Sequence, residues 1–128
     1  MKKSGIIIPN GEHLEPHEYE TLLLLTNLGK RIELIPRSHT PKCKTADFVM
    51  DGLEWEMKAP VGTSRRTIEH SFRVAATQSE NIIIDLRNLK ESLEANSIRL
   101  LKDRFSHSRR VKRLKIILHS EEILDYKH

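Results

Sequence analysis

The segment from Asn81 to Leu86 constrains the fold of this 128-residue chain most, because it holds three isoleucines in succession. A strand with one face in solvent alternates apolar and polar residues, whereas an unbroken β-branched run is typical of a strand buried on both faces. Such a strand needs a covering layer on each side of its sheet. The run therefore predicts a sheet with helices on both faces.

The rest of the chain supplies helices and strands around this segment. Apolar spacing, Gly and Pro positions and capping residues predict helices over 16–28, 64–78 and 89–106, and strands over 31–37, 46–50, 53–59, 81–86 and 112–119. The order α-β-β-β-α-β-α-β indicates an α/β (α+β) fold with a mixed central sheet flanked by helices. We expect a single domain over 1–128, with 1–12 as an N-terminal arm or an edge strand.

The segment 46–59 reads as a hairpin that gathers charged side chains. Leu53, Trp55 and Met57 share one strand face, which we expect to be a core face, whereas Glu54, Glu56 and Lys58 share the other. A turn at Asp51-Gly52 would bring Asp47, nine positions before Glu56, back beside it. Two carboxylates and a lysine at one point are the equipment of a divalent-metal phosphodiesterase. The alternative is an exposed cross-strand ion pair, which would contribute little.

Charge and composition narrow the classes of partner. The formal net charge is +4, and residues 104–115 contain six Arg or Lys and no acid. That run would attract phosphate, although a solvated helix end has the same composition. One cysteine, Cys43, permits neither an internal disulfide nor a zinc cluster. The longest apolar run, Leu22 to Leu25, is too short to span a membrane. We expect a cytoplasmic site of action, reached directly or by delivery on a larger carrier.

The residues of the hairpin carry a resemblance to a known family. Asp47 followed by Glu56-Met57-Lys58, in this order of elements, resembles the PD-(D/E)xK nuclease superfamily with its restriction-endonuclease-like core. Further segments are similar to the C-terminal tRNA-nuclease toxin domains of the contact-dependent inhibition protein CdiA and their stand-alone relatives: 17–18, Gly29, 44–47, 52–60, Ser64, 67–68, 78–79 and 81–87. The resemblance covers about 13–119. One departure is Ala46, where the superfamily name expects proline; that position shapes backbone and holds no metal.

The resemblance implies a site and a cofactor. Asp47 and Glu56, with the main-chain carbonyl of Met57, would hold Mg²⁺ or Mn²⁺, and Glu18 would bind the metal or order its water. Only the resemblance selects Glu18 over Glu20. Lys58 would orient or deprotonate the attacking water, or stabilise charge on the phosphate. A hard cation prefers oxygen ligands, and a lysine beside carboxylates favours its charged form, so we prefer the electrostatic role.

Other polar residues have plainer interpretations. Ser64 and Thr67 are expected to cap a helix first and to contact substrate phosphate second. Arg109, Arg110, Lys112 and Arg113 are candidates for gripping the nucleic-acid backbone. We expect Trp55 in the core, Glu54 at the rim outside the site, His70 on the surface, and Asp85 in a structural ion pair with Arg87.

The resemblance and the residues together predict a metal-dependent endoribonuclease that hydrolyses phosphodiester bonds in tRNA and acts as a growth-inhibiting toxin. A cognate immunity protein is then an expected partner. Two alternatives remain open: a metal-dependent DNA endonuclease of the same fold, because the bare site does not separate RNA from DNA, and a non-catalytic nucleic-acid-binding module. The sequence leaves the tRNA, the bond cut and the oligomeric state undetermined.

Overall fold

A computed structural model describes residues 5–7, 15–36, 46–62 and 64–128. These residues form one seven-stranded mixed sheet in the order β1-β2-β3-β4-β5-β6-β7. The strands are β1 (Gly5–Ile7), β2 (Arg31–Leu34), β3 (Phe48–Met50), β4 (Leu53–Lys58), β5 (Asn81–Asp85), β6 (Arg113–Ile117) and β7 (Ile123–Lys127). The helices are α1 (Pro16–Asn27), α2 (Arg65–Ala76) and α3 (Glu94–His107), with a short 3₁₀ turn, η1 (Glu91–Leu93).

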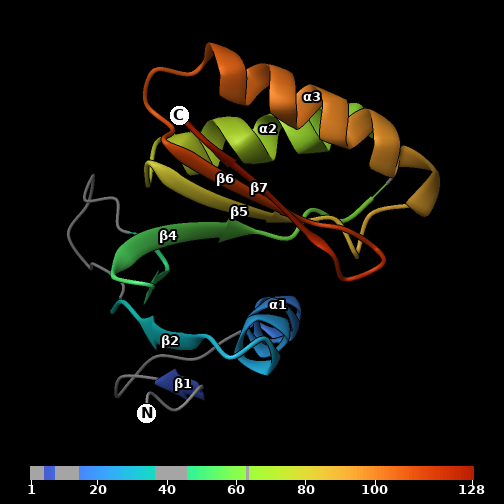
Figure 1. The fold of residues 1–128 in the computed structure, drawn as a ribbon. Helices are drawn as coiled ribbons and strands as arrows, with labels where there is room; N and C mark the ends of the chain where they lie inside the picture. Colours follow the sequence, from blue (N-terminus) through green and yellow to red (C-terminus); the bar gives the residue numbers. More distant parts are fainter. Residues whose placement is uncertain (1–4, 8–14, 37–45, 63) are drawn as a thin grey trace.

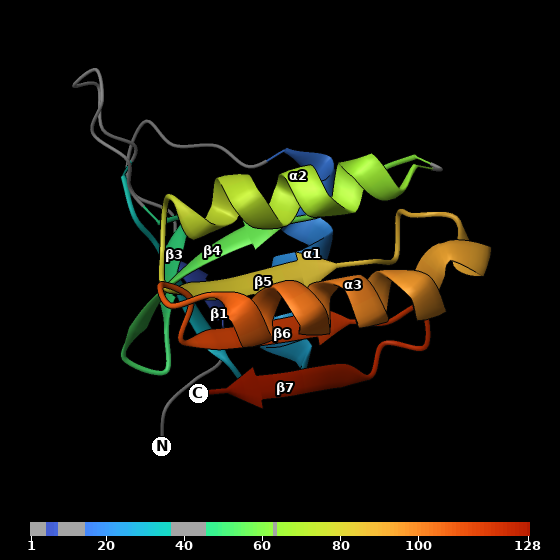
Figure 2. The same ribbon diagram turned by 90° about the horizontal axis from the view of Figure 1, so that it is seen from above.

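The helices form two layers on opposite faces of the sheet. Figure 1 shows α2 and α3 above β4 to β7, and α1 below the sheet. Seen from above, α2 and α3 lie side by side and run roughly along the direction of the strands (Figure 2). The predicted mixed sheet with helices on both faces is therefore confirmed, and β5 is buried at all five positions.

Parallel pairing is limited to three neighbours. The pairs β1–β2, β4–β5 and β5–β6 are parallel, whereas β2–β3, β3–β4 and β6–β7 are antiparallel. The antiparallel β3–β4 pair is the predicted hairpin, and the parallel pairs β1–β2, β4–β5 and β5–β6 are connected through α1, α2 and α3, respectively. The edge-strand alternative for the N-terminal segment is confirmed by β1 over Gly5–Ile7; the rest of 1–12 lies outside the described residues.

Two apolar cores lie on the two faces of the sheet. The upper core joins α2 and α3 to the upper face through Ile68, Phe72, Leu101, Phe105 and the strand residues Ile82, Ile84, Leu114 and Ile116. The lower core joins α1 to Phe48, Trp55, Met57, Ile83 and Ile117. Trp55 is 2% exposed and its indole N–H donates to the Met50 carbonyl at 3.0 Å, so its predicted place in the core is confirmed.

The structure corrects two expectations. The strand β7 was not predicted at all, and the segment 89–93 is irregular chain and η1 rather than the start of a helix. In α1, Tyr19 and Leu23 are 47% and 41% exposed, whereas Thr21, Leu24 and Leu25 are buried. The buried side of α1 therefore includes the polar side chain of Thr21.

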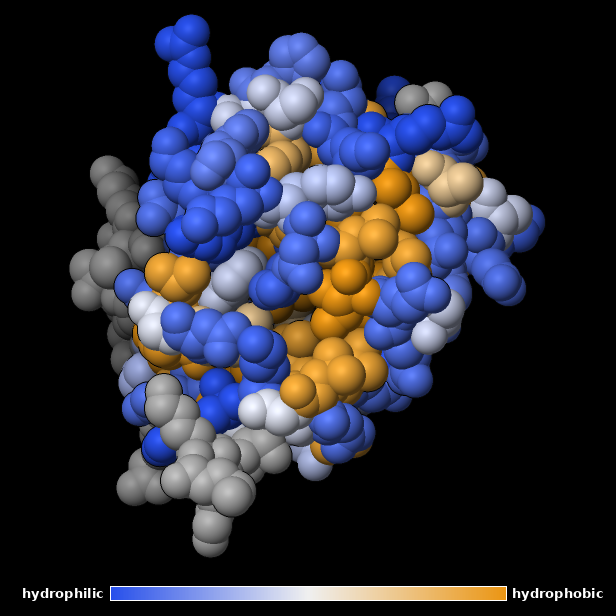
Figure 3. Space-filling model, in the orientation of Figure 1, coloured by the Kyte–Doolittle hydropathy of each residue, from blue (hydrophilic) through white to orange (hydrophobic). Residues whose placement is uncertain are grey.

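β7 forms one edge of the sheet, where it pairs with β6, and its own side chains are only partly buried or exposed. Ile123, Leu124 and Tyr126 are half-buried, and Figure 3 shows apolar surface gathered over β6 and β7, between the α3 side and α1. None of the described helices is long and apolar enough to cross a membrane. Cys43 and the polar loop 38–44 lie outside the described residues.

Candidate metal and phosphodiester site

A tight turn fixes the register of the hairpin that carries the candidate site. Asp51 and Gly52 have φ of 55° and 77°, the left-handed pair that a two-residue type I′ turn requires. The register pairs Met50 with Leu53 and Phe48 with Trp55, and the Asp47 amide donates to the Trp55 carbonyl at 2.9 Å. Continuing this register places Asp47 opposite Glu56, as the sequence predicted.

Asp47 is held in place by the backbone of β4. Its Oδ2 accepts the Met57 N–H at 2.9 Å, and the residue is half-buried. A carboxylate that accepts a backbone N–H has a fixed orientation, since the donor belongs to the sheet. The Asp47 carboxylate is therefore oriented toward β4 before any ligand binds.

Glu56 is 1% exposed, which the predicted polar strand face did not anticipate. It pairs in register with Ile82 of β5, on the face that α2 covers with Ile68 and Phe72. Its Oε2 lies 3.1 Å from Lys58 Nζ, while Oε1 has no hydrogen-bond partner among the described residues. The exposed ion pair considered from sequence is therefore wrong for this residue, because α2 closes over it.

Burial raises the pKa of Glu56 from 4.5 to about 8. The largest cause is loss of solvation, followed by the negative charge of Asp47; the charge of Lys58 acts in the opposite direction. A hydrogen bond between the two carboxyl groups, which needs a proton on one of them, adds to the shift. The negative charge of Asp47 thus opposes ionisation of Glu56, and Lys58 is the positive charge that favours it.

This arrangement suits a hard divalent cation. A buried carboxylate oxygen without a donor, next to a second carboxylate, is costly unless a proton or cation compensates it. Mg²⁺ is commonly held by one or two carboxylates and keeps several waters. No group of three or more His, Cys, Asp or Glu side chains in the described part of the chain is arranged to hold a metal. Among the described residues, Asp47 and Glu56 could therefore offer such an ion two carboxylates, and water would have to complete its coordination.

Lys58 lies at the end of β4, where the site meets solvent. Its side chain is 30% exposed, although Glu56 beside it is closed off. The ammonium can thus face a bound anion while remaining 3.1 Å from the carboxylate. Glu54, in the same row, is exposed, in agreement with its predicted place at the rim.

The structure does not join Glu18 to these two carboxylates. Glu18 is in the first turn of α1, on the opposite helical layer, and its Oε1 accepts the Glu15 N–H at 3.3 Å, as one half of a capping box. Ser64 caps α2, as predicted, because its Oγ accepts the Arg66 N–H at 3.2 Å. Thr67, half-buried, lies in the first turn of the same helix.

The basic candidates lie at the other end of the parallel strands. Arg110 donates to the Thr77 carbonyl at the end of α2 at 3.1 Å, and Arg113 donates to Asn81 Oδ1, at the start of β5, at 3.2 Å. Lys112 donates to the Arg109 carbonyl at 3.2 Å, and both residues are exposed. These side chains therefore lie at the edge where β5 and β6 begin, whereas Lys58 lies where β4 ends.

A polar cluster at the end of β5 was predicted only in part. The ion pair of Asp85 with Arg87 is confirmed, with Arg87 Nη2 2.9 Å from Asp85 Oδ2. Nothing in the sequence indicates the third member, Thr21, because a threonine within a leucine-rich helix carries no signal of a partner 64 residues away. His70, predicted on the surface, is exposed.

Comparison with known proteins identifies similar sequences and folds. A family model described as the contact-dependent growth inhibition CdiA C-terminal domain matches residues 44–123. Among solved structures, the chain is similar to the "CdiA-CT/CdiI toxin and immunity complex from Burkholderia pseudomallei", with a TM-score of 0.63 and 18% identity, over 97% of this chain and 100% of that chain. At this identity the likeness shows a shared fold. No curated protein matches the chain.

Proposed function

Because the chain belongs to the contact-dependent growth inhibition CdiA C-terminal domain family, we propose that it is a growth-inhibiting toxin that cleaves RNA, with tRNA as substrate, in a metal-dependent reaction of the PD-(D/E)xK type. One observation carries the proposal: a buried carboxylate, Glu56, lies beside Asp47 and 3.1 Å from Lys58, with an oxygen that lacks a donor among the described groups. This set matches what phosphodiester hydrolysis requires.

Each residue has a role that follows from its place. Asp47 and Glu56 would hold Mg²⁺ or Mn²⁺, and Asp47 is oriented for this by the Met57 N–H. The bound ion would supply Lewis-acid chemistry and lower the pKa of a bound water. Lys58, partly exposed, would stabilise negative charge developing on the phosphate oxygens. Glu18 is proposed to order water at the metal, as the resemblance implies.

The partners follow from the family. The similar Burkholderia pseudomallei structure is a toxin and immunity complex, so we propose that a cognate immunity protein binds this chain as well. Delivery would be by CdiA-type carriage, with action on nucleic acid in the recipient cell. The net charge of +4 favours an anionic substrate.

The test is cleavage of total tRNA and of plasmid DNA in Mg²⁺, with and without EDTA. Asp47→Asn is the sharper variant because an amide oxygen can still accept the Met57 N–H while the charge is lost. We expect Asp47→Asn and Lys58→Ala to lose at least 100-fold in rate, consistent with losing a metal ligand or a charge stabiliser. The matched control is Glu54→Gln, an exposed carboxylate on the same strand, which should cleave as wild type does.

Three results would contradict the proposal. Full activity in excess EDTA would exclude the metal. More than a tenth of wild-type activity in Asp47→Asn or Lys58→Ala would exclude the assigned site. Nicked plasmid with intact tRNA would replace the RNA substrate by DNA.

A further inference from the structure

A histidine in the turn between β6 and β7 has a hydrogen-bond acceptor at each ring nitrogen. His119 Nδ1 lies 2.7 Å from Glu94 Oε1, at the start of α3, and Nε2 lies 2.7 Å from the Leu89 carbonyl, in the chain after β5. A neutral imidazole has one N–H and can donate to only one of them, whereas the imidazolium donates to both. The two contacts therefore fit the charged ring.

The surroundings of His119 favour this charge. Loss of solvation lowers the pKa of His119, but the hydrogen bonds to Leu89 and Glu94 and the negative charges of Glu94 and Glu91 outweigh it, so the pKa lies above the usual 6.5. Loss of solvation likewise opposes ionisation of Glu94, yet its bonds to the His119 N–H, at 2.6 Å, and to the ring hold the pKa of Glu94 below 4.5. At neutral pH the contact is thus an ion pair of two half-buried side chains.

The ring connects segments at the edge of the sheet where the parallel strands end. Leu89 forms a parallel bridge with Gly62, and the Lys90 N–H donates to the Gly62 carbonyl at 3.3 Å. Gly62 lies in the loop between the last residue of β4, Lys58, and the helix α2. Through Leu89, His119 therefore also holds the loop that follows Lys58.

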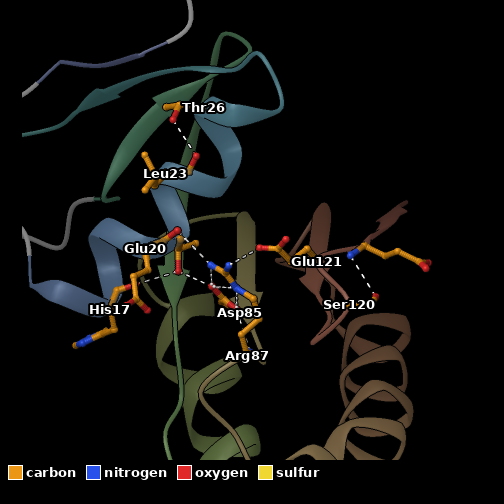
Figure 4. Close-up of polar contacts among 10 residues, drawn as sticks. His17, Glu20, Leu23, Thr26, Asp85, Arg87, Ser120 and Glu121 are labelled. Carbon is orange, nitrogen blue, oxygen red and sulfur yellow. Dashed lines mark hydrogen bonds and ion pairs between the residues drawn. The ribbon is translucent and has the colours of Figure 1, made fainter.

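The opposite side of the β6–β7 turn has a weaker attachment. Glu121 has a left-handed φ of 73°, which a non-glycine residue adopts only when surrounding contacts hold it. Its carboxylate lies 3.3 Å from Arg87 Nη1, and Figure 4 shows the two side chains facing each other. Glu121 is 61% exposed, whereas His119 is 19% exposed. Because exposed ion pairs contribute little, His119 is the stronger of the two attachments.

We propose that His119 is a pH-sensitive latch whose imidazolium holds the β6–β7 turn, the segment 86–94 and the loop 59–62 together. Loss of the ring proton leaves either Glu94 or the Leu89 carbonyl without its donor, and the segment 86–94 then opens more often. Since the folded-state pKa is raised, the latch is fully closed below pH 6.5 and is lost as pH rises through that pKa. The proposal depends on neither the metal nor the reaction.

The experiment follows the whole chain in EDTA by NMR between pH 5.5 and 9. We expect both His119 ring nitrogens to carry protons at pH 6 and the ring to titrate above 6.5. Protection from hydrogen exchange, relative to an unstructured chain, should fall at least about tenfold at the amides of Leu89, Leu93 and His119 as the ring loses its proton. The amides of Ile82, Ile83 and Ile84, in the buried strand β5, report global unfolding and serve as the internal reference.

Three variants separate the latch from general stability. His119→Gln should exchange at Leu89 and Leu93 at pH 6 as wild type does at high pH. Glu94→Gln keeps an acceptor for the His119 N–H but removes the charge, so the ring should titrate at lower pH and the loss of protection should move with it. His70→Gln, which replaces an exposed histidine of α2, should behave as wild type does.

Two results would overturn the latch. One is a His119 ring with a single protonated nitrogen at pH 6. The other is protection at Leu89 and Leu93 that changes with pH only as much as protection in β5 does, or that is the same in wild type and His119→Gln.

Discussion

At the scale of single residues, Glu56 has the most unusual environment among the candidate site residues. A carboxyl group beneath α2, beside a second carboxyl group and with one lysine as its counter-charge, is poised between holding a proton and holding a cation. Its raised pKa has a cause that geometry makes plain, since desolvation and Asp47 both oppose ionisation. Strongly perturbed carboxyl groups of this kind cluster at functional sites.

The shift predicts how the stability of the metal-free protein depends on pH. Between pH 4.5 and about 8 the folded protein keeps a proton on Glu56 that the unfolded chain releases, so the free energy of unfolding falls as pH rises through this window. Each pKa unit corresponds to about 1.4 kcal/mol, so the loss is on the order of a few kcal/mol. Urea unfolding in EDTA at pH 5 and pH 8.5 measures it.

Two variants isolate the contribution of Glu56. Glu56→Gln should remove most of the decrease and be more stable than wild type at pH 8.5, whereas Glu54→Gln, which is exposed, should keep the wild-type slope. Added Mg²⁺ should restore stability to wild type at pH 8.5 but not to Glu56→Gln, because metal binding needs the ionised carboxylate. Equal pH slopes in wild type and Glu56→Gln would show that another group causes the decrease.

At the scale of elements, the β3–β4 hairpin aligns the site and α2 closes it. The register of the hairpin brings Asp47 and Glu56 together. Two separate features determine this register: the Asp51-Gly52 turn, and the packing of Phe48 and Trp55 in the lower core. A one-residue slip would move both carboxylates to the opposite face. The geometry of the site should therefore survive a weakened turn.

Gly52→Ala tests this redundancy. A Cβ at position 52 meets no atom within 4 Å, so the cost comes only from the left-handed backbone, φ 77°. We expect a loss of about 1 kcal/mol in the free energy of unfolding, with Mn²⁺ affinity unchanged. Asp51→Gly is the control, because it keeps the turn and loses only the exposed contact with Lys30. Mn²⁺ affinity that fell together with stability would show that the turn alone sets the register.

At the scale of the whole molecule, the parallel strands separate two charged regions. The carboxylates and Lys58 lie toward the end of β4, whereas Arg109, Arg110, Lys112 and Arg113 lie where β5 and β6 begin. An extended nucleic acid could contact both regions only if it crosses the molecule. In the proposed function, the basic residues would bind the backbone at a distance from the bond that is cut.

Arg109→Ala combined with Arg110→Ala should therefore weaken tRNA binding without moving the cleavage position. Each lost phosphate contact lowers the slope of log K against log salt by about 0.7–0.9, so for two lost contacts we expect a decrease of up to about 1.8, equal for different tRNAs. Filter binding across a salt series measures it. Arg99→Ala with Lys102→Ala, which removes two charges from α3, is the matched control. A changed cleavage position would mean that Arg109 or Arg110 reads the substrate.

The sequence alone determined the elements that have strong local signals. The isoleucine run gave the doubly covered strand β5, Asp51-Gly52 gave the turn, and the spacing of Ile68, Phe72 and Ala75 gave the buried side of α2, because periodicity and turn chemistry are local properties. These signals also placed Asp47 opposite Glu56. The sequence does not predict β7, because apolar and polar residues alternate little from Ile123 to Lys127 and the strand is only partly buried.

The tertiary structure alone decided the environment of the site. Nothing within the hairpin indicates that α2 buries Glu56, that one of its oxygens lacks a donor among the described residues, or that Thr21 binds Asp85. Each of these depends on contacts between segments far apart in the chain, and desolvation depends on all surrounding atoms at once. The local sequence pattern thus identified Asp47 and Glu56 as neighbours. Tertiary packing determined the ionisation of the site residues, their fixed positions and their access to solvent.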